Sequence, residues 1–262
     1  MTSAGHPANP RDHSHHPSHV PGSEATDSAG VTWGGRDLSP SGFEADTGAA
    51  DPTLLTVLAE TADDQTLMRE VASARFLIPI VAEPTELDHS GPLVTDASVD
   101  LAAVTLVGPD GQRALPVFSG TESLAAWDPR ARPVPVDAAR VGQAAISEQC
   151  DVIVIDVAGP STRVLRPSMV WALAMGQDWQ PAHEDPAVVR AVDAATATED
   201  DLTAYTLEDG RPHGRGILGV VLTLRPGLAA DQVEGIATRV GERLATDGEV
   251  RARIDGLAFR LT

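Results

Sequence analysis

Hydrophobic and polar positions form two kinds of pattern along this chain. Continuous apolar runs, which are typical of buried strands, occur at 75–81, 151–157 and 217–224. Apolar residues that recur every three or four positions predict helices at 137–150 and 228–245. Because helices and strands interleave, the sequence predicts an α/β fold in which helices flank a mixed sheet.

Turn residues define the borders of several strands. The Asp110-Gly111 pair in "GPDGQ" predicts a hairpin that joins strands at 101–107 and 113–118. Pro79 interrupts the apolar run at 75–81, and a proline cannot donate a hydrogen bond to a neighbouring strand. We therefore expect this strand to lie at a sheet edge or to contain an irregularity.

Changes of composition predict the domain organisation. Residues 1–30 are rich in Pro, Ser, Gly and His and are expected to form a disordered tail, because they cannot bury apolar area. Residues 31–50 are expected to be either a free linker or a strap that docks through its aromatic residues. An N-terminal α/β domain at 51–180 and a smaller α/β (α+β) C-terminal domain at 186–262 follow, separated by a Pro- and acid-rich stretch.

The charge balance narrows the range of partners. The net charge of −19 argues against nucleic acid, because an acidic surface repels phosphate backbones. All 19 basic residues are arginines, so neither a P-loop lysine nor Schiff-base chemistry is available. No membrane partner is expected, because the chain has no apolar run long enough to span a bilayer and residues 1–30 lack the apolar core of a signal peptide.

The single cysteine, Cys150, excludes a disulfide within the chain and suits a reducing cytoplasm. It lies between a predicted helix and a predicted strand. We therefore expect a small buried hydrophobe at this position rather than a reactive thiol, and we predict a cytoplasmic location.

The stretch "VFSGTE" at 117–122 joins a predicted strand to a predicted helix and offers the first candidate site. Ser119 and Glu122 have the spacing of a capping box, so Ser119 is expected to begin the helix. A nucleophilic serine would need a general base and the pattern G-x-S-x-G, which this stretch lacks. A phosphate site at the helix start stays open, although Glu122 would face the phosphate.

A ligand crevice is a further interpretation of the same region. Asp156 ends the clearest strand, and the carboxyl ends of strands line ligand crevices in open α/β sheets. Asp100, Ser119 and Thr121 are the other candidate crevice residues. Alternatively, Asp156 only starts a turn toward Pro160. The sequence predicts no catalytic residue.

Patterns that suggest a metal or a cofactor are weak here. The tail holds histidines that could bind a metal ion loosely: His13, His15, His16 and His19. Their expected affinity is adventitious, so no metal site is predicted. A G-x-G-x-x-G pattern at 214–219 precedes a strand instead of a helix, so no dinucleotide cofactor is predicted. The acidic runs at 199–201 and 208–209 are expected to be solvated loop faces.

Several longer blocks carry a family resemblance: "RFLIPIV", "VTLVGPDGQRALPVFSGTESLAAWDP", "EQCDVIVIDVAGP", "VLRPSMVWALAMGQDW" and the weaker "DGLAFRLT". On these blocks the chain resembles the actinobacterial type of the SseB family, which is linked to enhanced serine sensitivity, over roughly residues 31–262. The resemblance implies an SseB N-terminal and an SseB-like C-terminal domain in a cytoplasmic protein without established catalytic residues or cofactor. Ala97 departs from the lysine expected in that family, so a ligand that needed this lysine would not bind here.

The sequence favours a non-enzymatic binding or regulatory module that engages a protein partner through a sheet face or a crevice. The basis is the lack of a nucleophile–base pair, of metal-ligand spacing and of a phosphate loop. The alternative is a small-molecule sensor or enzyme that uses a crevice near Asp100, Ser119 and Asp156. Metal handling by the tail is a third hypothesis. The sequence predicts no particular oligomeric state.

Overall fold

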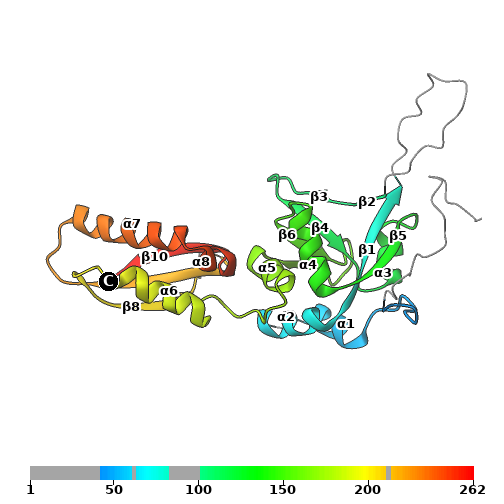
Figure 1. Cartoon of the computed structure of the whole chain (residues 1–262), viewed down its shortest axis with the longest axis horizontal. Coiled ribbons are helices and arrows are strands. Elements are labelled where there is room, and N and C mark those ends of the chain that lie inside the picture. Colours follow the sequence, from blue (N-terminus) through cyan, green and yellow to red (C-terminus); the bar gives the residue numbers. More distant parts are fainter. Residues whose placement is uncertain (1–41, 61–62, 83–100, 211–213) are drawn as a thin grey trace, which may run out of the picture. The chain divides into compact units, whose positions relative to one another are not determined.

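The computed structural model describes residues 42–60, 63–82, 101–210 and 214–262 (Figure 1). Ala45–Thr262 belong to one compact unit. The elements are α1 (Pro52–Ala59), α2 (Asp64–Ser73), β1 (Arg75–Ala82), β2 (Leu101–Ala103), β3 (Leu106–Val107), β4 (Arg113–Val117), α3 (Thr121–Trp127), β5 (Arg132–Asp137), α4 (Ala138–Ser147), β6 (Val152–Ile155), β7 (Arg163–Leu165), α5 (Pro167–Ala174), α6 (Pro186–Thr196), β8 (Leu202–Asp209), β9 (Ile217–Leu224), α7 (Ala230–Thr246), α8 (Gly248–Arg253) and β10 (Gly256–Leu261). This interleaving of helices and strands confirms the predicted α/β class.

Aspartates set the start of many of these helices. A carboxylate accepts backbone N–H bonds of the first turn in α1, α2, α4, α6 and α8, from Asp51, Asp63, Asp137, Asp185 and Asp247. The bonds satisfy N–H groups that have no partner inside the helix. They also hold the pKa of Asp51 and of Asp63 below the ordinary value of an aspartate.

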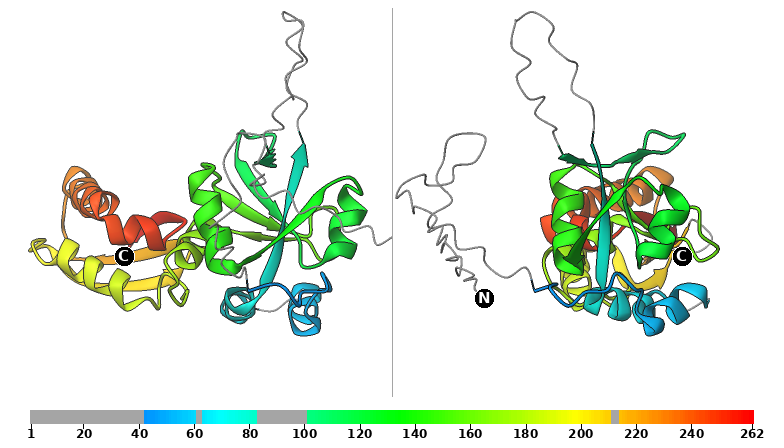
Figure 2. Two further views of the ribbon diagram at one scale, coloured as in Figure 1. Left: turned by 45° about the vertical axis from the view of Figure 1, so that its right-hand side comes forward. Right: turned by 90° about the vertical axis from the view of Figure 1, so that its right-hand side faces the viewer.

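Two linked sheets form the N-terminal part of this unit. β4 and β6 are the parallel centre of a sheet with the order β3-β4-β6-β7, and the predicted hairpin at Asp110-Gly111 joins β3 to β4. The second sheet has the order β2-β1-β5. Leu77 and Phe118 link the two sheets through N–H···O bonds of 2.8 and 2.9 Å. Figure 2 shows β1 between α3 and α4, both of which contact it.

The predicted edge position of Pro79 was wrong, because β1 is the central strand of its sheet. β2 pairs with β1 only from Ile80 onward, so at Pro79 the strand β1 is paired on one side only, with β5. Pro79 stands opposite Pro133, and two prolines can oppose each other only in a pair that forms no backbone hydrogen bonds. The missing N–H groups therefore cost the sheet nothing. The strand predicted at 101–107 is divided into β2 and β3.

A first hydrophobic core fills the space between the sheets and α1, α2, α4 and α5. Its members include Leu58 and Ile153, both fully buried. Gly142 lets α4 approach α5 closely, because a Cβ there would lie 2.5 Å from the backbone nitrogen of Ala174. Cys150 follows α4 and is buried in the same core, as predicted. Burial raises the pKa of its thiol above the ordinary value.

A third sheet, β10-β9-β8, has its own hydrophobic core. β9 pairs antiparallel with β8 and parallel with β10, and α7 and α8 make the connection between the parallel strands. Leu218, Val220 and Leu222 are alternate residues of β9 and share one core with α6, α7 and α8. Alternate strand residues point to the same side, so all three helices cover one face of this sheet.

The acidic run at 199–201 is not wholly a solvated loop face, which corrects the prediction. The Glu199 side chain is only 4% exposed and accepts bonds from Arg239 at 2.5 and 3.1 Å and from Arg243 at 2.8 Å. The bonds from Arg239 are the largest cause of a pKa of Glu199 below its ordinary value, against the opposite effect of burial. The run at 208–209 likewise lies within β8 and not in a loop.

Glu199→Gln is expected to lower the free energy of unfolding by about 2 kcal/mol at neutral pH, because it removes the charge from a buried, arginine-bonded carboxylate. A carboxylate with a lowered folded-state pKa stabilises the fold only while it is ionised. The difference between wild type and Glu199→Gln should therefore be full above the ordinary pKa of 4.5 and shrink as the pH falls through the lowered pKa.

Urea unfolding of both proteins at several pH values measures this difference. Glu242→Gln, at an exposed position of α7, the helix that carries Arg239 and Arg243, is the control and should show almost no difference at any pH. A Glu199→Gln difference that stays constant as the pH falls through that range would contradict the assignment.

Several predictions concern positions outside the described residues: the tail at 1–30, most of the segment 31–50, Ala97, Asp100, His13, His15, His16 and His19. Within the described part of the chain, no helix is both long and apolar enough to cross a membrane.

Candidate functional site

Ser119 and Asp156, two of the candidate crevice residues, are in direct contact. The Ser119 backbone N–H donates to Asp156 Oδ1 at 2.8 Å, and the Ser119 hydroxyl donates to Asp156 Oδ2 at 2.7 Å. Both residues are buried, with 2% and 5% of their surfaces exposed. Each polar group thus has a partner in the interior, as buried polar groups require.

The prediction that Ser119 caps the following helix was wrong. α3 begins one residue later, with Gly120 as its N-cap, and the Ser123 hydroxyl donates to the Gly120 carbonyl oxygen at 3.0 Å. The Ser119 hydroxyl is bound instead by Asp156, a residue 37 positions away. A hydrogen bond to a charged acceptor is stronger than one between neutral groups, so the tertiary contact overrides the local motif.

Asp156 also starts the turn that the sequence suggested. Its backbone has a φ of +51°, a conformation that aspartate adopts more readily than most residues. Its carbonyl oxygen accepts from the Gly159 N–H at 3.0 Å and from the Thr162 hydroxyl at 2.7 Å. Asp156 therefore forms the turn with its backbone and holds Ser119 with its side chain.

Arg75 binds the same region from the start of β1. Its guanidinium donates to the carbonyl oxygens of Ser119 at 3.0 Å and of Ala49 at 2.6 Å, and its Nε pairs with Asp46 at 2.8 Å. No sequence pattern singles out Arg75. An arginine at the start of an apolar strand has no local partner that would indicate its role.

The remaining crevice candidates are Thr121 and Asp100. The Thr121 N–H donates to the Gly48 carbonyl oxygen at 2.8 Å, and the Thr121 side chain is exposed. Asp100 lies outside the described residues. Ser119 and Asp156 bind each other, and in this arrangement they stabilise a turn.

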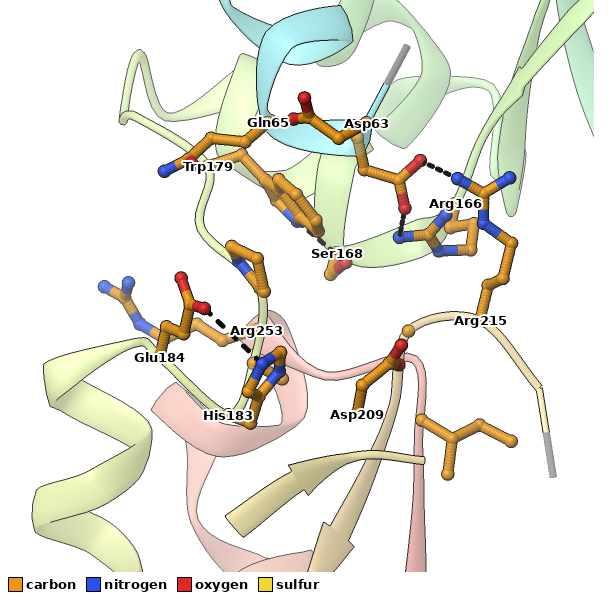
Figure 3. Close-up of a pocket in the computed structure, with 15 residues that line it drawn as sticks. Asp63, Gln65, Arg166, Ser168, Trp179, His183, Glu184, Asp209, Arg215 and Arg253 are labelled. Atoms are coloured by element: carbon orange, nitrogen blue, oxygen red, sulfur yellow. Dashed lines mark hydrogen bonds and ion pairs between the residues drawn. The ribbon is translucent and has the colours of Figure 1, made fainter. Parts of the chain in front are cut away.

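A pocket of about 630 Å³ opens in another part of the unit and is the better candidate (Figure 3). It is lined by the start of α2, the start of α5, the segment before α6, the end of β8, the start of β9 and the end of α8. Ser119, Thr121 and Asp156 are not among its lining residues. The candidate residues that the sequence suggested therefore lie outside this pocket.

Asp255 holds one wall of the pocket. Its carboxylate accepts from Arg166 Nε at 2.8 Å and from the Ser168 N–H and hydroxyl at 2.8 and 3.0 Å. The Ser168 hydroxyl in turn accepts from Trp179 Nε1 at 3.1 Å. The Asp255 side chain is only 7% exposed, so these bonds act in a largely dry environment. They fix the orientation of the arginine and the tryptophan that face the pocket.

Gly216 permits this arrangement. It has a φ of +79°, which side-chain-bearing residues rarely adopt. A Cβ at this position would lie 2.1 Å from Asp255 Oδ2 and 2.6 Å from Arg166 Nε. The glycine pattern at 214–219 therefore marks a close approach of the backbone to an ion pair. As predicted, β9 and not a helix follows it.

Asp64 brings two arginines together at the pocket. Its Oδ2 pairs with Arg166 Nη2 at 2.9 Å, and its Oδ1 accepts a bond from Arg215 Nη2. The guanidinium of Arg166 also lies 5.7 Å from the ring centroid of Trp179, within the range of a cation–π contact. The Arg166 side chain is thus held on several sides, whereas Arg215 has this carboxylate as its one partner among the described residues.

The third arginine of the pocket, Arg253, has most of its donors engaged. It pairs with Asp185 at 2.9 Å and with Glu249 at 3.0 Å, and it donates to Gln177 Oε1 at 3.1 Å. Its guanidinium lies 5.0 Å from the ring centroid of Trp171. Arg253 therefore serves mainly to hold α8 against its neighbours.

The pocket's side chains offer little for covalent chemistry. Of the described residues that line the pocket, Ser168 is the one that bears a hydroxyl, and this hydroxyl is bonded to both Asp255 and Trp179. His183 lies 3.5 Å from Glu184, its neighbour in sequence. Among the described residues, no group of three or more His, Cys, Asp or Glu side chains could hold a metal ion. The arrangement is suited to binding through arginine N–H groups and an aromatic wall.

A family model described as the SseB protein N-terminal domain matches residues 53–172. The match runs from α1 into α5 and so includes Asp64, Arg166 and Ser168 of the pocket. No curated protein and no solved structure matches the chain.

Proposed function

We propose that this chain, in which residues 53–172 form an SseB N-terminal domain, is a non-enzymatic binding or regulatory module that holds a protein partner at the pocket around Asp64, Arg166 and Arg215. One observation carries the proposal. The pocket presents accessible arginine donors, while the hydroxyl that could act as a nucleophile is bonded into the fold.

The kinds of residues at the pocket favour a protein as the partner. Arginine and tryptophan are the residue types most enriched at the energetic centres of protein interfaces. Only 3% of this chain is aromatic, and it has 4 tryptophans. Trp179 lines the pocket, and Trp171 packs against Arg253. This concentration of rare aromatic residues supports a recognition surface.

The resemblance to the SseB family supports three further proposals about the domains, the type and the location of the protein. We propose that 186–262 is an SseB-like C-terminal domain, that the protein is of the actinobacterial type and that it acts in the cytoplasm. The absence of a disulfide-forming cysteine pair supports a reducing location.

Capture of a partner by the immobilised full-length chain tests the proposed function. Arg215→Ala should reduce capture of the stoichiometric partner about tenfold, because it removes an exposed donor from the centre of the site. Arg225→Ala is the matched control, since Arg225 is 60% exposed against 66% for Arg215 and also pairs with one aspartate.

Retention of the partner by Arg225→Ala and its loss from Arg215→Ala would support the proposal. Equal capture by both variants would contradict it. Turnover of a substrate by the purified protein would contradict its non-enzymatic character.

A further inference from the structure

We infer that the partner presents a carboxylate to Arg166 and Arg215, and that Asp64 occupies the position of that carboxylate in the free chain. The inference rests on the proposed function and names the chemistry of its ligand. In this arrangement Asp64 is an internal competitor that the partner displaces.

The position for a carboxylate is already visible. Asp64 offers one oxygen to Arg166, directly before α5, and the other to Arg215, in the turn before β9. The two arginines are labelled in Figure 3. Two guanidinium groups that share one carboxylate form a recognition site for that group, because each presents N–H donors in a planar fork. A carboxylate of the partner could therefore use the same donors.

Both arginines keep donors for an incoming group. Arg166 uses Nε for Asp255 and Nη2 for Asp64, so its Nη1 has no partner among the described residues. Among the described residues, Arg215 binds only Asp64, through Nη2, so its Nε and Nη1 can donate to an incoming group. Both side chains line the pocket, so a solute can reach them.

Asp64 can leave at small cost. Its pair with Arg215 involves a side chain that is 66% exposed, and exposed ion pairs contribute little to stability. Its pair with Arg166 is less exposed, with 19% of each side chain accessible, but the incoming carboxylate replaces it with an equivalent pair. Asp64 is the first residue of α2 and follows the N-cap Asp63. The positive end of the helix dipole favours its charge there even without the arginines. Arg166 stays in place, because Asp255 still holds it.

A carboxylate fits the surroundings better than a phosphate. Asp63, Glu184 and Asp209 also line the pocket, and they would repel a doubly charged group more strongly than a singly charged one. Trp179 and Ile217 supply apolar surface beside the arginines. The expected ligand is therefore an acidic side chain or a chain end next to an apolar residue.

Titration of the full-length protein with small probes, followed in NMR spectra of the arginine Nε–H groups, tests the inference. N-acetyl-leucine represents a chain end and N-acetyl-glutamate amide an acidic side chain. N-acetyl-leucine amide and N-acetyl-glutamine amide are the matched probes without a carboxylate, and inorganic phosphate is the other anion. At least one carboxylate probe should shift the Arg215 signal, and its uncharged partner should not.

Variants distinguish the competitor role of Asp64 from a structural one. Asp64→Asn should bind the carboxylate probe about tenfold more tightly, because the internal competitor loses its charge. Arg215→Ala should bind it about tenfold more weakly, and Arg225→Ala should bind it as wild type does. A thermal melt of each variant confirms that it is folded. Weaker binding by folded Asp64→Asn would overturn the inference.

The outcomes also separate this inference from the proposed function. If no carboxylate probe binds, or if phosphate binds more tightly, the inference is overturned, even where Arg215→Ala loses the protein partner. If the probes bind as expected but partner capture is insensitive to Arg215→Ala, the inference is supported and the protein-binding function is contradicted.

Discussion

Asp156→Ala is expected to lower the free energy of unfolding by about 4 kcal/mol, the largest effect of the substitutions considered. The change leaves the buried N–H and hydroxyl of Ser119 without their acceptor. Each buried, unsatisfied polar group costs about 1–3 kcal/mol. The alanine must also adopt a φ of +51°, which costs an L-residue about 1 kcal/mol more than it costs aspartate or asparagine.

Urea unfolding of Asp156→Ala and Asp156→Asn gives the measurement and its control. Asparagine tolerates the positive φ, accepts from the Ser119 N–H and can donate to the Ser119 hydroxyl oxygen, so it should lose only about 1 kcal/mol. If Asp156→Ala is as stable as Asp156→Asn, the carboxylate does not hold the turn, and a role of Asp156 outside the fold would have to be sought.

Asp255→Ala has the second largest expected effect, a loss of about 3 kcal/mol. Its side chain is 7% exposed and serves Arg166 and both polar groups of Ser168. Without it, Asp64 is the one carboxylate that pairs with Arg166 among the described residues, and the buried Ser168 N–H loses its acceptor. The freed Ser168 hydroxyl also no longer fixes Trp179.

Thermal unfolding combined with tryptophan fluorescence measures this effect, because Trp179 loses an ordered neighbour. Asp64→Asn is the comparison, since the Asp64 side chain is 19% exposed against 7% for Asp255 and its loss should therefore cost less. Equal losses for the two variants would mean that Asp255 contributes no more than the less buried Asp64 does.

Helices and strands that depend on residues close together in the sequence were predicted correctly. The hairpin at Asp110-Gly111 and the strand at 151–157 follow from residues within a few positions of each other. Caps such as Asp137 act over three residues, so they can be identified without tertiary information. These short-range effects account for most of the helices and strands.

Predictions failed where a distant partner decides the outcome. The capping motif at Ser119 is locally sound, but a carboxylate 37 residues away binds the hydroxyl. Glu199 has the pattern of a solvated residue, and its burial depends on arginines 40 and 44 residues further along. No local pattern contains that information, because the energy of the contact exists only after the chain has folded.

The pocket could not be predicted for the same reason. Asp64, Arg166, Arg215 and Asp255 come from four separate segments, and of these only Arg215 stands in a recognisable motif, the glycine pattern at 214–219. The glycine pattern at 214–219 was the one local signal near the pocket. Its meaning, a close approach of Gly216 to Asp255, depends on the tertiary structure.

The burial of Cys150 gives the protein a built-in reporter of its own opening. The thiol is the only one in the chain, 7% of the residue is exposed, and burial raises its pKa. An alkylating reagent therefore reacts with it chiefly in molecules whose first core has transiently separated. The rate of labelling in native buffer then measures the population of open molecules without denaturant. A variant with a destabilised turn at Asp156 should therefore show faster alkylation of Cys150.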